Sequence, residues 1–113
     1  MTTKLEYSFD DEYVTKFCFD MENNKIEIHF RAYFDLAKNE RIITPTIWII
    51  ENWTKAKSKL SSESIYADLE NNLGIISMVL SLEINDTCLE LTVNTTDNRY
   101  VDLIFDNPQL NLK

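Results

Sequence analysis

The clearest pattern in the chain is an alternation of apolar and polar residues between Leu73 and Phe105. Apolar side chains recur there at every second position, which is the period of a strand with one buried and one exposed face. Two breaks rich in Asn and Asp divide the stretch into residues 73–84, 88–93 and 100–105. Asn and Asp suit tight turns because they tolerate a positive φ angle. The sequence therefore predicts three antiparallel strands joined by two short turns.

The pairing of these strands follows from keeping the apolar residues on one face, since a slip of one residue would move every leucine to the solvent side. With Asn85 and Asp86 as a two-residue turn, the expected pairs of the first hairpin are Ile84–Thr87, Leu82–Leu89, Leu80–Leu91 and Met78–Val93. An odd loop length at the second turn keeps the apolar face intact. The expected pairs there are Val93–Val101, Leu91–Leu103 and Leu89–Phe105.

Strand-like alternation also covers most of the first half of the chain. Residues 4–9 predict a first strand with Leu5, Tyr7 and Phe9 turned inward. Residues 13–21 alternate next, with Tyr13 and the other odd-numbered residues on one face, and a turn at 22–25 follows. The clearest strand of this half is 26–36, where even-numbered apolar residues alternate with charged and polar ones. This arrangement indicates a hairpin with one buried and one exposed face.

A polar connection over residues 37–46 leads into an apolar run at Ile47–Ile50. Consecutive apolar residues are typical of a strand that is covered on both faces, near the middle of a sheet. Trp48 and Trp53 lie five residues apart and so fall on opposite faces of an extended chain. We expect both to be core anchors, while exposed tryptophans would instead indicate ligand stacking.

The period changes between residues 61 and 74, where Ile65, Leu69 and Leu73 recur at every fourth position. This spacing, with Ser62 as N-cap and Gly74 as stop, predicts one short helix over residues 63–72 that packs on the sheet. The expected fold is a single domain over residues 1–113, mainly β with α+β as the alternative. Its sheet is an antiparallel meander of six to eight strands, curved or sandwich-like.

The charge of the chain is its most informative surface property. Its 113 residues carry a net charge of −8. Residues 60–113 hold nine acidic and two basic residues, a net of −7. Such a field repels nucleic acid and anionic membrane and attracts a basic partner, although acidity can also serve solubility alone. We expect the partner-binding residues to be Glu63, Asp68, Glu70, Glu83, Glu90, Asp102 and Asp106.

Candidate catalytic and metal-binding residues are few. His29 is the only histidine, and it falls on the exposed face of its strand, where a surface role is the usual one. The acidic run at residues 10–12 is followed by no glycine-bearing calcium loop and indicates a solvated turn. The expectation is therefore a protein that is not an enzyme, with no cofactor and no metal.

The compartment is predicted from the start of the chain and from its cysteines. The first ten residues contain charges and no apolar run, and no stretch approaches the roughly 20 apolar residues that cross a bilayer. These features predict a cytoplasmic protein without a secretory signal. Cys18 and Cys88 are then expected to be reduced thiols at strand positions.

Residues 47–56 (IWIIENWTKA), together with the acidic strands that follow, resemble the small cytosolic immunity proteins of bacterial toxin–immunity systems, including contact-dependent growth inhibition. The likeness covers about two-thirds of the chain and lies in its overall plan, since these families share no signature residues. It implies that the protein binds the toxin of a sister cell and blocks it. A basic nuclease would fit the acidic charge. The alternative left open is a non-enzymatic β domain that binds a ligand or serves as a scaffold.

Overall fold

The structure is a computed structural model that describes residues 6–113, and most of these residues lie in antiparallel strands. The elements are β1 (Tyr7–Ser8), β2 (Glu12–Asp20), β3 (Lys25–Asp35), β4 (Glu40–Glu51), β5 (Lys55–Leu60), β6 (Ala67–Asp68), α1 (Leu69–Asn72), β7 (Ile76–Asn85), β8 (Cys88–Thr95), β9 (Tyr100–Asp106) and β10 (Gln109–Leu112). The predicted mainly β class is confirmed. The described chain has ten strands rather than six to eight, and the two-residue strands β1 and β6 account for the excess over eight.

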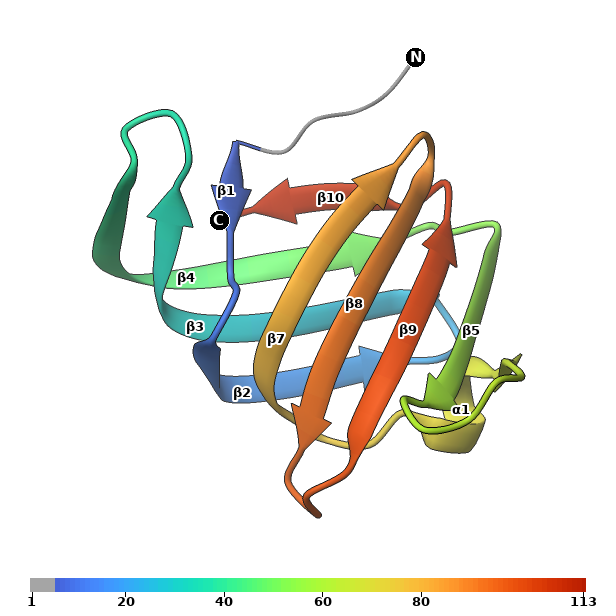
Figure 1. Ribbon diagram of the computed structural model, residues 1–113. Coiled ribbons are helices and arrows are strands. Elements are labelled where there is room, and N and C mark those ends of the chain that lie inside the picture. The colour runs from blue at the N-terminus through green and yellow to red at the C-terminus, as the bar shows by residue number, and fades with distance from the viewer. Residues whose placement is uncertain (1–5) are drawn as a thin grey trace.

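The strands form one continuous antiparallel ladder that folds into two layers. Its order is β10-β4-β3-β2-β7-β8-β9-β5-β6, and β1 pairs with the end of β3. Strand β2 pairs with β3 along most of its length but with β7 only at Glu12 and Tyr13. Beyond that junction the two halves diverge, so that β7–β9 and β5 cross in front of β2–β4 (Figure 1). We call β1–β4 and β10 the first layer, and β5–β9 the second layer.

The hydrophobic core lies between the two layers and is rich in aromatic rings. Phe9 stacks on Phe30 with ring centroids 4.0 Å apart, and its centroid lies 5.0 Å from that of Trp48. Trp48 also donates from Nε1 to the Tyr7 hydroxyl at 3.0 Å, so its polar atom is satisfied. The described part of the predicted first strand is therefore confirmed as an inward-facing segment, while Leu5 lies outside the described residues.

Both tryptophans belong to this core, as expected of core anchors. Trp48 is 0% exposed and Trp53 is 8% exposed, and the Trp53 ring lies 5.0 Å from that of Phe105. Their placement on opposite faces was wrong, because Asn52 adopts a positive φ of 55° and turns the chain between them. Strand β4 is buried on both faces from Trp48 to Ile50. It lies next to the edge strand β10, however, and not near the middle of the sheet.

The β8–β9 register matches the prediction at all three pairs, including Val93–Val101. The β7–β8 register is shifted by two residues near the turn, because Asp86 and Thr87 form the turn and Asn85 pairs with Cys88. A register irregularity between Val79 and Ser81 then places Val79, and not Leu80, fully in the core. A shift of two residues preserves the faces of a strand, so the alternation alone could not reveal it.

The first half of the chain also differs from the prediction, at a bulge in β2 and at the start of β4. A bulge between Val14 and Lys16 reverses the face of β2, so Val14 packs on the core and Tyr13 is exposed. The predicted connection over residues 37–46 is mostly strand, since β4 begins at Glu40. Cys18 and Cys88 are free thiols on β2 and β8.

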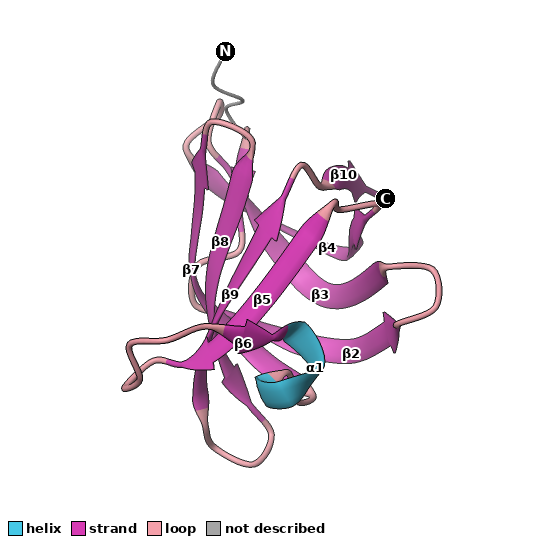
Figure 2. Ribbon diagram, turned by 90° about the vertical axis from the view of Figure 1, so that its right-hand side faces the viewer, coloured by secondary structure: helices cyan, strands magenta, loops and turns pink. Residues whose placement is uncertain are grey.

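The helix is present but shorter than predicted. It spans Leu69–Asn72, while residues 61–66 form a loop in which Ile65 is exposed. Leu69 is buried and fixes the helix beside β5 at the margin of the second layer (Figure 2). In the described chain no helix is long and apolar enough to cross a membrane.

The turns are made without glycine. In the described chain every non-glycine residue with a positive φ is Asn or Asp, as the sequence indicated. These residues are Asp11, Asn24, Asn39, Asn52, Asp86, Asn98 and Asn107.

Candidate functional site

Four of the seven predicted partner-binding carboxylates lie on the outer face of the second layer. They are Glu83 on β7, Glu90 on β8, and Asp102 and Asp106 on β9. The residues that alternate with them on these strands, such as Leu89 and Leu103, point into the core. The outer face is turned toward the viewer in Figure 1. The structure thus brings together an acidic group from three consecutive strands.

Glu83 and Glu90 are directly opposite each other on β7 and β8. Glu83 is exposed, and Glu90 is half-buried and accepts a hydrogen bond from Asn85 Nδ2 at 3.2 Å. Like charges at directly opposed positions destabilise a sheet. The Glu83–Glu90 pair is therefore a local cost to folding that a cationic partner would relieve.

Asp102 is engaged within the chain. Its carboxylate accepts hydrogen bonds from Lys59 Nζ at 2.9 Å, from Ser61 Oγ at 2.8 Å and from Thr92 Oγ1 at 3.0 Å. Burial alone would raise the pKa of Asp102, but these three hydrogen bonds outweigh it and lower that pKa below its ordinary value. Asp102 therefore attaches the loop after β5 to the sheet.

The lysines of β5 reduce the acidity that the sequence suggested for this face. Strand β5 pairs with β9, which places Lys59 opposite Asp102 and Lys55 opposite Asp106. Lys57 forms an ion pair with Asp68 at 3.1 Å. A count of charges along the chain misses this neutralisation, because the basic run precedes the acidic segment in sequence and pairs with it in space.

The other two predicted residues lie at the margin of the second layer. The Glu63 carboxylate accepts a hydrogen bond from the backbone N–H of Leu60 at 3.3 Å, and its carbonyl accepts one from Lys59 Nζ at 3.0 Å. Glu70 is exposed on α1, beyond β6 (Figure 2). The structure does not bring these two residues into the group formed by Glu83 and Glu90.

A groove of about 220 Å³ lies over this outer face. Its lining includes Tyr66 together with Glu83, Glu90 and Asp102. The Tyr66 ring centroid is 5.5 Å from Lys59 Nζ. An aromatic ring beside carboxylates is a suitable surrounding for a cationic side chain.

Asp10 is an acidic residue that sequence reasoning left out of the site. Burial raises the pKa of Asp10, and the negative charges of Asp11 and Glu83 raise it further. The acidic region therefore continues from β7 to the turn before β2. No sequence signal marks this electrostatic influence, because 73 residues separate Asp10 from Glu83.

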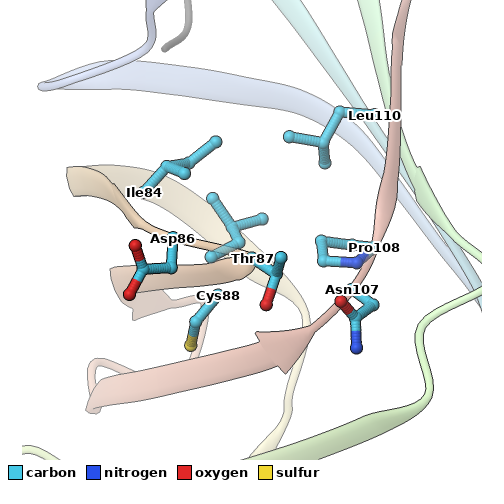
Figure 3. A pocket seen from close by; sticks show the side chains of 8 residues that line it. Ile84, Asp86, Thr87, Cys88, Asn107, Pro108 and Leu110 are labelled. Carbon is cyan, nitrogen blue, oxygen red and sulfur yellow. The ribbon is translucent and has the colours of Figure 1, made fainter. Parts of the chain in front are cut away.

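A second concavity of about 230 Å³ opens at one end of the molecule, between the β7–β8 turn and the start of β10 (Figure 3). Ile84, Leu89, Pro108 and Leu110 supply its apolar wall. Its polar rim is Asp86, Thr87, Cys88 and Asn107. Burial and the nearby carboxylates of Asp106 and Glu90 raise the pKa of Cys88, so this thiol is a poor nucleophile at neutral pH.

His29 is less exposed than its place on the polar face suggested. Its side chain is 24% exposed, and Nε2 lies 4.0 Å from Glu27 Oε2 without a hydrogen-bond partner. It is flanked by Lys16 on β2 and Ile47 on β4. Among residues 6–113, no group of three or more His, Cys, Asp or Glu side chains is placed to hold a metal ion.

Comparison of this protein with protein-family models, with curated proteins and with solved structures finds no match.

Proposed function

We propose that this protein is an immunity protein that binds a basic bacterial toxin and neutralises it by covering its surface. The observation that supports the proposal is the directly opposed Glu83–Glu90 pair on an open, strand-built face of a protein with a net charge of −8. Asp10 extends the negative charge from this pair to the turn before β2. A basic nuclease is the class of toxin that this charge fits best.

The outer face suits such a partner because the backbone that carries its carboxylates is held in place before binding. They project from paired strands, so little backbone entropy is lost on association. Exposed charges of this kind mainly speed association, and charge pairs that become buried add affinity. Neutralisation needs no chemistry from the immunity protein. It requires only that the bound domain obstructs the toxin.

Co-expression with the toxin encoded immediately upstream tests the proposal. We expect the protein to restore growth and to co-purify with the toxin. If the protein neither restores growth nor co-purifies with the toxin, the proposal is refuted.

A charge-reversal pair locates the interface within the same system. Glu83→Lys with Glu90→Lys should slow association strongly at low salt, and the difference from the wild type should shrink as salt screens the charges. The matched control is Glu22→Lys with Glu40→Lys, which makes the same change in net charge at exposed turn and strand-end positions of the first layer. Equal slowing by both pairs would show that only total charge matters.

A ligand-binding domain is the second candidate, and the end concavity in Figure 3 is the observation that favours it. Because both tryptophans are buried, such a ligand would enter that concavity and would not stack on Trp48 or Trp53. Titration with a neutral apolar dye tests this candidate. Saturable binding that Leu110→Trp abolishes, without loss of folding, would support it over the immunity role.

A further inference from the structure

A row of apolar side chains crosses the outer face of the second layer next to the carboxylates. The pairing registers place Tyr13 opposite Met78, Met78 opposite Asn94, and Asn94 opposite Tyr100. These residues therefore lie side by side on β2, β7, β8 and β9. At about 4.8 Å between neighbouring strands, the row is about 14 Å long. We call Tyr13, Met78 and Tyr100, with the polar Asn94 between the last two, the apolar row.

The two ends of the apolar row are open to solvent. Tyr13 is 71% exposed and Tyr100 is 56% exposed, and Met78 between them is half-buried. Tyr13 is exposed because of the bulge in β2, which turns its ring away from the core. Tyrosine and methionine are enriched at protein interfaces, and tyrosine is frequent among the residues that dominate binding energy.

The apolar row and the acidic group belong to one continuous face. On β8, Asn94 in the row and Glu90 in the acidic group are four residues apart, or about 14 Å along the strand. Thr92 lies between them on the same face and bonds Asp102. An interface of ordinary size buries about 800 Å² on each partner, which is enough to cover both features.

We propose that the apolar row anchors the basic partner protein, and that Glu83 and Glu90 guide its approach and fix its orientation. This inference rests on the proposed function and adds the chemistry of the partner: an apolar recess flanked by Lys or Arg on the side that meets Glu83. Beyond Tyr13 the first layer presents Arg31 and Arg41 in a neighbouring groove, with Arg41 paired to Glu12 at 2.6 Å. The cationic side of the partner therefore lies over β7 and β8.

A second copy of this chain is a less suitable occupant. A two-fold contact through the apolar row would bring the acidic groups of two copies, each with a net charge of −8, close together. Their repulsion would oppose association. The charge of the face thus selects a cationic protein over self-association.

Binding kinetics with the upstream-encoded toxin domain, immobilised as an inactive variant, test the inference. We expect Tyr13→Ala combined with Tyr100→Ala to weaken binding at least thirtyfold through faster dissociation, with the association rate and its salt dependence unchanged. The matched control is Leu36→Ala with Ile43→Ala, which removes two exposed apolar side chains from the first layer. This control should change the dissociation constant less than twofold.

Each other outcome has a distinct meaning. If the toxin domain binds the wild type and the tyrosine variant equally, the inference fails and the proposed function stands. If the wild type does not bind, the proposed function fails and the inference falls with it. Self-association in sedimentation that the tyrosine variant abolishes would show that the occupant is a second copy. Thermal melts of all variants should match the wild type, because the substituted tyrosines are exposed.

Discussion

Replacing Asp102 by Asn tests whether this carboxylate stabilises the fold, as its contacts indicate, or is needed only for binding a partner. The carboxylate accepts three hydrogen bonds of 2.8–3.0 Å, one of them from the Lys59 ammonium. An Asn in its place can still accept from Ser61 and Thr92, but its amide group cannot neutralise Lys59.

The expected loss of stability follows from these contacts. A hydrogen bond to a charged group contributes about 1.5–3 kcal/mol, and the bonds that Asn retains become weaker neutral ones. The Asp102 side chain is 23% exposed, so solvent screens part of the loss. We expect Asp102→Asn to lower the free energy of unfolding by about 2 kcal/mol at pH 7. At a urea dependence of about 1.5 kcal/mol/M, the unfolding midpoint falls by about 1.3 M.

The pH dependence supplies an independent check on the same residue. Because folding lowers the pKa of Asp102, its stabilisation is present above the unfolded-chain value of about 3.9 and is lost as the pH falls through the lower folded-state pKa. The difference between wild type and Asp102→Asn should therefore shrink in acid. Urea unfolding at pH 7 and at acid pH measures both values.

The control for this prediction is Asp86→Asn, which removes one charge at an exposed turn where Asn tolerates the positive φ of 55°. It should change the free energy of unfolding by less than about 0.5 kcal/mol. An unchanged midpoint for Asp102→Asn at pH 7, or a difference that persists undiminished in acid, would refute the structural role.

Three further predictions concern the core, a turn and the thiols. Phe9→Ala should destabilise the domain by about 3–5 kcal/mol, measured by urea unfolding, because its ring is fully buried; a loss below about 1 kcal/mol would contradict its place in the core. Asn52→Ala should cost about 1–2 kcal/mol because of its positive φ, and Asn52→Gly should cost less; equal losses would show that backbone conformation is not the cause. Cys18 is exposed and should react with a thiol reagent faster than Cys88, because burial raises the pKa of Cys88. Cys18→Ser should remove the fast phase of the reaction, and loss of the slow phase instead would reverse the assignment.

The sequence predicted best where the alternation is uninterrupted. The pairs Val93–Val101 and Leu91–Leu103 are found as expected, because β8 and β9 contain no bulge between them. The register predicted for the first hairpin differs from the observed one by two residues. Asn85 and Asp86 are both good turn residues, and periodicity does not choose between registers two residues apart. The predicted helix begins too early, because the helical spacing of apolar residues extends back to Ile65, which is exposed in the structure.

The candidate site was harder to predict than the fold. Glu83 and Glu90 lie on one face as the alternation predicts, since a register shift of two residues leaves the faces unchanged, but their direct opposition was not predicted. The alternation placed Tyr13 on the same face as Phe17 and Phe19, because a single bulged residue near Thr15 reverses the phase and leaves no mark in the pattern. The neutralising position of the β5 lysines depends on a pairing between distant segments, which periodicity does not determine.

The sharing of β2 between both layers has a consequence for how this domain melts. Its backbone belongs to two hydrogen-bond ladders, so neither layer can separate without disturbing the strand on which the other depends. Hydrogen exchange should accordingly reveal one cooperative unit rather than two. Any protein that binds tightly to the strands of the second layer would then slow the opening of the whole domain, and would protect the domain from proteolysis at sites that the bound protein never touches.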